Sequence, residues 1–161
     1  MKILFLSHRL PFPANKGEKI RTNNQIKYLA DLWHKVIVLS PVGSQDDATR
    51  LIEFCKHPNI SAELFDILAK PLRLLKGLVQ GTSLSEANFY TPSLQTRFND
   101  LISEAHFDAI ICSSSAMGAY IYKSGVISQL PKKPKLFMDF MDLDSDKWRQ
   151  YSERTSWPMS W

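Results

Sequence analysis

Side chains able to bind an anion or move a proton are concentrated in three short segments of this 161-residue chain. The first is basic and follows an apolar run at the N-terminus, the second is a turn of three serines, and the third is rich in aspartate. The first 35 residues hold seven lysines and arginines against two acidic residues, whereas the whole chain has a net charge of +4. Such a local positive field attracts a phosphate-bearing or other anionic ligand, or an anionic membrane surface, although a solvated basic face has the same composition.

The basic segment contains one glycine at the predicted start of a helix. Glycine at this point lets backbone N–H groups approach an oxyanion closely, and the positive end of the helix adds to the attraction. A helix start that needs only a flexible residue would explain the same glycine. The segment contains neither G-x-G-x-x-G nor G-x-x-x-x-G-K-[ST], which excludes a dinucleotide turn and a Walker A cradle. The residues predicted to bind the anion are Lys16, Gly17, Lys19 and Arg21.

The serine turn, Ser113 to Ser115, follows an apolar run. It lacks the G-x-S-x-G pattern and has no evident histidine and aspartate partners, so a nucleophilic hydrolase is not indicated. Ser114 or Ser115 is typical of a helix cap. Ser114 is nevertheless placed where it would contact a bound ligand.

The aspartate-rich segment has several interpretations. Alternating aspartates resemble part of a calcium loop, but Lys147 stands where that loop needs glycine and no glutamate follows at its twelfth position. The aspartyl nucleophile of a phosphotransferase normally follows the first strand of its domain, whereas this segment follows the last predicted strand. Capping of a following helix is the structural alternative for two of the residues, Asp144 and Ser145. We predict no metal site, and the candidate ligand-binding residues here are Asp142, Asp144, Ser145 and Lys147.

Five apolar runs rich in β-branched and aromatic residues are spaced by helix-like segments. Near-continuous apolar strands of this kind are buried on both faces, as in a parallel sheet covered by helices. The pattern predicts an α/β fold: a doubly wound, Rossmann-like, three-layer domain with a mainly parallel sheet. Ligands bind such sheets beyond the carboxyl ends of the strands, where the strand order reverses. The predicted strands are Lys2–Ser7, Lys35–Ser40, Ser61–Ile67, Asp108–Ser113 and Lys135–Phe140.

Four helices are predicted between these strands. The first, Gly17–Trp33, has a polar first half that we expect to face a cleft and a second half whose apolar residues belong in the core. That core face comprises Ile26, Leu29, Ala30, Leu32 and Trp33. The other predicted helices are Asp46–Lys56, Pro92–Ala105 and Ser115–Leu130, the last ended by Pro131 and Pro134.

The leucine-rich stretch at residues 68–81 is basic. Three cations recur every third residue and the leucines lie on the other side, which is the arrangement of a helix resting on an anionic membrane surface. An ordinary amphipathic helix packed on the sheet is the alternative. The cations predicted to dock on the membrane are Lys70, Arg73 and Lys76.

Composition and length favour one globular domain. The chain is 44% hydrophobic and 22% charged, and no run reaches the roughly 18 apolar residues of a spanning helix. The N-terminal apolar run is cut short by His8, Arg9 and prolines, so it is predicted to be a strand and not a signal peptide. Cys55 and Cys112 show neither zinc-ligand spacing nor a disulfide framework, and Cys112 is expected in the core. We expect a cytoplasmic protein, attached if at all to the inner face of the membrane, with no nucleic-acid partner.

The runs Met1 to Arg21 and Met138 to Trp148 resemble family 4 glycosyltransferases, which have the GT-B fold of two α/β domains. The resemblance is to the sugar transferases associated with exopolysaccharide and PEP-CTERM gene clusters, whose first loop has the same proline, asparagine, lysine and glycine pattern. It implies that Gly17 approaches the phosphates or the sugar of the donor, with Lys16 and Glu18 beside it. It also implies that the segment after the fifth strand lines the sugar site, although this chain has Met141-Asp142 where many members have a histidine.

The resemblance therefore implies a retaining glycosyltransferase that moves a sugar from a UDP- or GDP-sugar to a glycan or lipid-linked acceptor, without a cofactor. It further implies that residues 1–161 correspond to the acceptor-side N-terminal domain. The donor nucleotide is held in that family by an E-x7-E motif of the C-terminal domain, which is expected to lie outside these residues, so that the chain alone is expected to be inactive. Asp142 and Glu18 are the candidate catalytic residues. The rival interpretation is a non-catalytic module that binds a glycan or an anionic metabolite.

Overall fold

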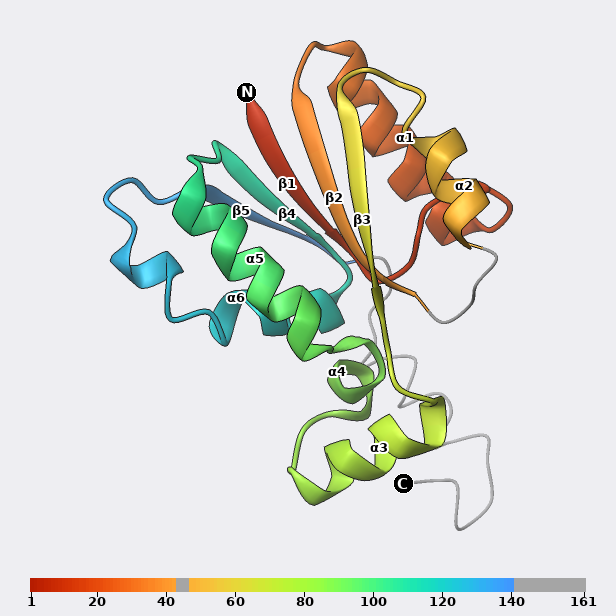
Figure 1. Cartoon of the computed structure of the whole chain (residues 1–161), viewed down its shortest axis with the longest axis vertical. Helices are drawn as coiled ribbons and strands as arrows, with labels where there is room; N and C mark the ends of the chain where they lie inside the picture. Colours follow the sequence, from red (N-terminus) through yellow and green to blue (C-terminus); the bar gives the residue numbers. More distant parts are fainter. Residues whose placement is uncertain (43–46, 141–161) are drawn as a thin grey trace.

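The computed structural model describes residues 1–42 and 47–140, and these form an α/β domain around one parallel sheet (Figure 1). All the pairings in the sheet are parallel, and its strand order is β3-β2-β1-β4-β5. The doubly wound, Rossmann-like fold predicted from the sequence is thereby confirmed. The strands are β1 (Lys2–Ser7), β2 (Lys35–Val42), β3 (Ile60–Asp66), β4 (Ala109–Ser113) and β5 (Lys135–Asp139).

The sheet is the middle of three layers. Leu4 and Leu6 of β1 point into a core shared with α5 (Pro92–Glu104) and α6 (Ala119–Tyr122). Phe5, between them, points into a second core shared with α1 (Gly17–Asp31) and α2 (Asp47–Phe54). Because successive side chains of a strand point to opposite faces, a continuously apolar strand supplies both cores. Cys112 of β4 is buried in the first core as predicted, and its burial raises the pKa of the thiol to about 12.

The end of α1 differs from the prediction. Ile26 and Ala30 are buried as expected, but Leu32 is exposed and Trp33 is 85% exposed. The helix stops at Asp31, and Trp33 adopts a left-handed backbone with φ of 62°. The N–H of Trp33 donates to the Ala30 carbonyl, so the chain turns away from the core before Trp33 can enter it.

The continuous helix predicted at Ser115–Leu130 is wrong. The structure has three short pieces there: η1 (Ser115–Gly118), α6 and η2 (Ile127–Gln129). The change from 3-10 to α-helix falls at Gly118, the last residue of η1, and the Ser124-Gly125 pair lies between α6 and η2. Glycine and serine are poor interior helix formers, and they allow the chain to break into turns here.

Two helices lie beyond the carboxyl end of β3, and both are seen below the sheet in Figure 1. The helix expected in the leucine-rich stretch is α3 (Lys70–Val79). A second helix, α4 (Leu84–Phe89), was not predicted; it begins where the Ser83 side chain accepts a hydrogen bond from the Glu86 N–H. The Ser83-x-x-Glu86 spacing is a capping-box signal that could have predicted it.

Candidate functional site

The strand order reverses between β1 and β4, since β2 and β3 lie on one side of β1 and β4 and β5 on the other. Open parallel sheets bind ligands at the carboxyl end of this switch point. His8 follows β1 here, and Ser113 ends β4. The two residues are joined, because Nδ1 of His8 lies 3.2 Å from the Ser113 carbonyl oxygen.

His8 is oriented by its two ring nitrogens. The Ser113 carbonyl can only accept, so Nδ1 carries a proton and Nε2 is left to face Glu18 Oε2 at 3.5 Å. The ring also packs edge-on against Phe89 of α4, with 5.3 Å between the ring centroids. Burial lowers the pKa of His8, although Glu18 and the Ser113 carbonyl oppose this shift. The neutral imidazole is therefore favoured, with Nε2 as a proton acceptor.

Glu18 ties the first turn of α1 to the end of β1. Its Oε1 accepts a hydrogen bond of 2.9 Å from Nη1 of Arg9, while Oε2 faces His8. An acidic side chain in the first turn also suits the positive end of the helix. The predicted catalytic residue Glu18 is thus placed at the switch point.

The first half of α1 reaches across to β4 and β5. Thr22 is buried, with its hydroxyl 3.3 Å from the Ser113 hydroxyl. Nη2 of Arg21 lies 2.6 Å from Asp139 Oδ1, and the Gln25 amide donates to Asp139 Oδ2 at 2.9 Å. The polar first half of the helix therefore faces the carboxyl edge of the sheet. Oε1 of Gln25 is buried there and has no hydrogen-bond partner among residues 1–42 and 47–140.

Ser114 occupies a strained position directly after β4. Its φ is 93°, a conformation that is rare for residues other than glycine. Its N–H donates to the Asp139 carbonyl at 3.0 Å, and its hydroxyl accepts from the Ala116 N–H at 3.3 Å. The expected capping role of Ser114 is confirmed, and the strain lies at the switch point, where functional residues are often strained.

The remaining predicted anion ligands lie at the start of α1. Lys16 is exposed at the residue before the helix, Gly17 is exposed at its first position, and Lys19 is half-buried. A Cβ on Gly17 would meet nothing within 4 Å, so steric crowding by the protein is not the reason for glycine there. The other predicted site residues, Asp142, Asp144, Ser145 and Lys147, lie outside the described residues.

Several members of this cluster were not predicted from the sequence. His8 and Asp139 are the most important, and the signal for each was its place next to the carboxyl end of an apolar strand. Thr22 and Gln25 lie on the polar half of the first helix, which was expected to face a cleft, but their partners depend on how the helix crosses the sheet. The full set of overlooked residues is His8, Thr22, Gln25, Ser113 and Asp139.

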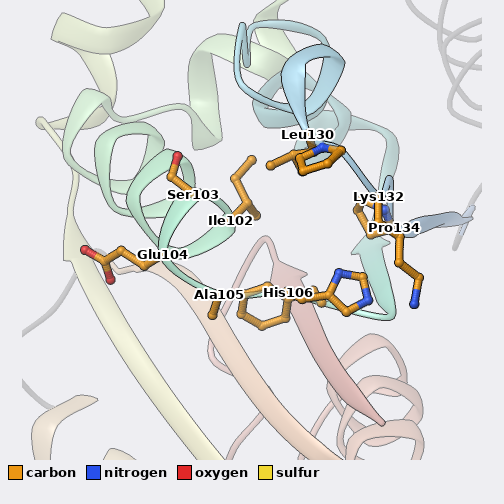
Figure 2. Close-up of a pocket in the computed structure, with 10 residues that line it drawn as sticks. Ile102, Ser103, Glu104, Ala105, His106, Leu130, Lys132 and Pro134 are labelled. Atoms are coloured by element: carbon orange, nitrogen blue, oxygen red, sulfur yellow. The ribbon is translucent and has the colours of Figure 1, made fainter.

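A pocket of about 260 Å³ lies at the opposite, amino edge of the sheet (Figure 2). It is formed by the end of α5, Phe107 and the segment from Leu130 to Pro134, and it is separate from the His8 cluster. In the part of the chain that the structure describes, no group of three or more His, Cys, Asp or Glu side chains could hold a metal ion. Within the same residues, no helix has the length and apolar character needed to cross a membrane.

Comparisons of the chain with protein-family models, with curated proteins and with solved structures found no match.

Proposed function

We propose that this chain is the acceptor-side domain of a retaining, sugar-nucleotide-dependent glycosyltransferase of polysaccharide biosynthesis. The observation that supports the proposal most directly is the contact at the switch point between His8 Nε2 and Glu18 Oε2, which are 3.5 Å apart. With His8 neutral, neither atom can donate to the other. A hydroxyl group of a bound sugar can donate to this pair, and such hydroxyls are what a glycan acceptor presents.

The surroundings suit the rest of such a substrate. Lys16 and the N-terminus of α1 offer positive charge to the diphosphate of a nucleotide sugar, which leaves when the sugar is transferred. The bond from the anomeric carbon to the diphosphate oxygen breaks, and a bond to the acceptor oxygen forms. The proton of the acceptor hydroxyl passes to a base, for which Glu18 is the candidate among the described residues and Asp142 the candidate outside them. The UDP- or GDP-sugar itself would be held mainly by a C-terminal donor-binding domain.

The proposed setting is cytoplasmic, at the inner face of a membrane where lipid-linked acceptors are available. The second candidate function is a non-catalytic module that binds a glycan or an anionic metabolite through the same cluster. The ion pairs of Arg21 with Asp139 and of Arg9 with Glu18 already engage two of the cations nearest the site, which favours a neutral glycan as the ligand of such a module.

The test is a transfer assay on the complete gene product with a panel of UDP- and GDP-sugars and lipid-linked acceptors. We expect turnover with one donor, and a loss of about 100-fold or more in kcat for Glu18→Gln, the range of a lost general base. Lys27→Gln, an exposed change on the same helix, is the matched control and should leave kcat unchanged. Binding of glycans without turnover of any donor would favour the binding module instead.

A further inference from the structure

The outer face of α3 is apolar and exposed. Leu72, Leu75, Leu78 and Val79 are between 57% and 82% exposed, although leucine and valine are usually buried. Their spacing of three and four residues places them on one side of the helix. The opposite side packs on α4 so closely that a Cβ on Gly77 would come within 2.3 Å of the Ala87 Cβ. The helix therefore buries its small-residue face and presents its leucines outward.

The three cations of this helix differ in their roles. Arg73 is engaged within the protein, since its Nε and Nη2 donate to Asn88 Oδ1 at 3.1 and 2.8 Å and its Nη1 donates to the Leu68 carbonyl. Arg73 therefore joins α3 to α4 through its hydrogen bonds to Asn88. Lys70 and Lys76 are exposed. Arg73 is therefore a structural residue, and the two lysines supply the exposed positive charge of the helix.

No acidic residue borders the exposed leucines in the sequence. The segment from residue 67 to residue 85 contains no aspartate or glutamate. Glu86, which follows it, accepts hydrogen bonds from Tyr122 and Lys123. An apolar strip accompanied only by positive charge is complementary to a bilayer whose headgroups are anionic, because leucines enter the acyl boundary while lysines meet lipid phosphates.

We propose that α3 is the surface by which this protein docks on an anionic lipid bilayer. The helix has the size and position for this role, because it lies beyond the carboxyl edge of the sheet (Figure 1) and no strand or helix other than α4 makes extensive contact with it among the described residues. A pocket of about 300 Å³, lined in part by Lys76 and Arg73, opens beside it. Docking does not require glycosyl transfer, so it can hold even if the proposed function is wrong.

The docked helix would lie close to the candidate site. α3 packs on α4 through Gly77 and Ala87, and Phe89 at the end of α4 contacts His8. Only one short helix thus separates the proposed bilayer surface from the switch point. A lipid-linked substrate held at the bilayer would reach the cluster without leaving the interface.

The test is co-sedimentation of the full 161-residue chain with vesicles of phosphatidylglycerol mixed with phosphatidylcholine, and with vesicles of phosphatidylcholine alone. We expect binding to the anionic vesicles only. The double variant Lys70→Glu/Lys76→Glu should lower the partition coefficient by about tenfold or more, given about 1 kcal/mol for each lysine near an anionic surface. Leu75→Ser/Leu78→Ser should also lower it while keeping the net charge.

The matched control is Lys27→Glu/Lys133→Glu, which changes the net charge equally at exposed lysines of α1 and of the segment before β5. It should retain most of the binding. Equal loss in both charge variants would show that only the total charge matters and would overturn the proposal, as would no binding by the unmodified chain. Thermal unfolding followed by circular dichroism checks that each variant is folded. The altered side chains are exposed, so the midpoints should be close to that of the parent chain.

Discussion

Nη2 of Arg21 lies 2.6 Å from Oδ1 of Asp139, an ion pair that joins the first half of α1 to the last residue of β5. The Asp139 side chain is only 12% exposed, and its second oxygen is held by Gln25. Arg21 was predicted from the sequence to bind a donor phosphate. In the structure Asp139 occupies the guanidinium, so a phosphate must compete with this carboxylate.

The competition predicts opposite effects for the two partners. Asp139→Asn should strengthen binding of inorganic pyrophosphate or a nucleotide sugar by about two- to fivefold, and Arg21→Gln should weaken it. The Arg21 side of the pair is 52% exposed, and exposed ion pairs contribute about 0.2–1 kcal/mol. Isothermal titration calorimetry on the variants measures both changes. If Asp139→Asn weakened binding instead, Asp139 would be a ligand-supporting residue and Arg21 would not be a phosphate ligand.

The lowered pKa of His8 predicts a pH-dependent stability. In the unfolded chain the imidazole titrates near its ordinary pKa of about 6.5, so below that pH the unfolded state binds a proton more readily than the folded state. The contribution of neutral His8 to the stability of the folded state is complete above about pH 6.5, and it is lost as the pH falls through the pKa of His8 in the folded chain. His8→Asn keeps an N–H for the Ser113 carbonyl but does not titrate. Urea unfolding measures the free energy of unfolding of both chains. The amount by which the parent chain exceeds this variant should shrink as the pH falls from about 7.5 to 5. A difference in the free energy of unfolding that grows at acid pH would contradict this prediction.

The contact between α3 and α4 depends on a glycine. Gly77→Ala places a methyl group within 2.3 Å of the Ala87 Cβ, and we expect a destabilisation of about 1–3 kcal/mol as the two helices separate. Gly125→Ala is the control, because a Cβ there meets nothing within 4 Å, and its effect should be within about 1 kcal/mol of zero. Denaturant midpoints of the two variants give the comparison. Similar midpoints would mean that the helices can move apart at no cost.

Trp33 occupies a position that suits glycine. Its left-handed backbone follows α1, where helices commonly carry glycine, and its side chain is 85% exposed. Trp33→Gly should raise the free energy of unfolding by about 0.5–1 kcal/mol, because the steric cost of the left-handed conformation disappears while little packing is lost. Chemical denaturation measures this change. A clear loss of stability would show that the indole makes contacts that outweigh the backbone cost.

The strands were predictable because their signal is strong. Each of the five is a short apolar run between polar segments, and every observed strand lies within two residues of its predicted bounds. Helix α1 was also found from its periodicity, but its end was not. Leu32 and Trp33 fit the apolar pattern, whereas the turn that ends the helix is made by backbone hydrogen bonds that a hydrophobic pattern does not reveal.

The candidate site was predictable as a place and less so as a set of contacts. The rule for parallel sheets selected the loop after β1 and the turn after β4, and both line the switch point. The pairing of Arg21 with Asp139 joins residues 118 positions apart, and it depends on the angle at which α1 crosses the sheet. The contact of Arg73 was not predictable either, because its partner Asn88 belongs to α4, a helix that was not predicted from the sequence.

The strained backbone of Ser114 makes the last contact in a ring of contacts around the switch point. His8 bonds to the Ser113 carbonyl, Ser113 meets Thr22 of α1, α1 holds Asp139, and the Asp139 carbonyl receives the Ser114 N–H. Neighbouring members are joined either by a hydrogen bond or by the backbone of α1, so we expect a displacement of one member to affect the next. Pairs of substitutions among these residues should consequently be energetically coupled. The change in the free energy of unfolding of a double variant should differ from the sum of the two single changes by about 0.5 kcal/mol or more, as is usual for residues in contact.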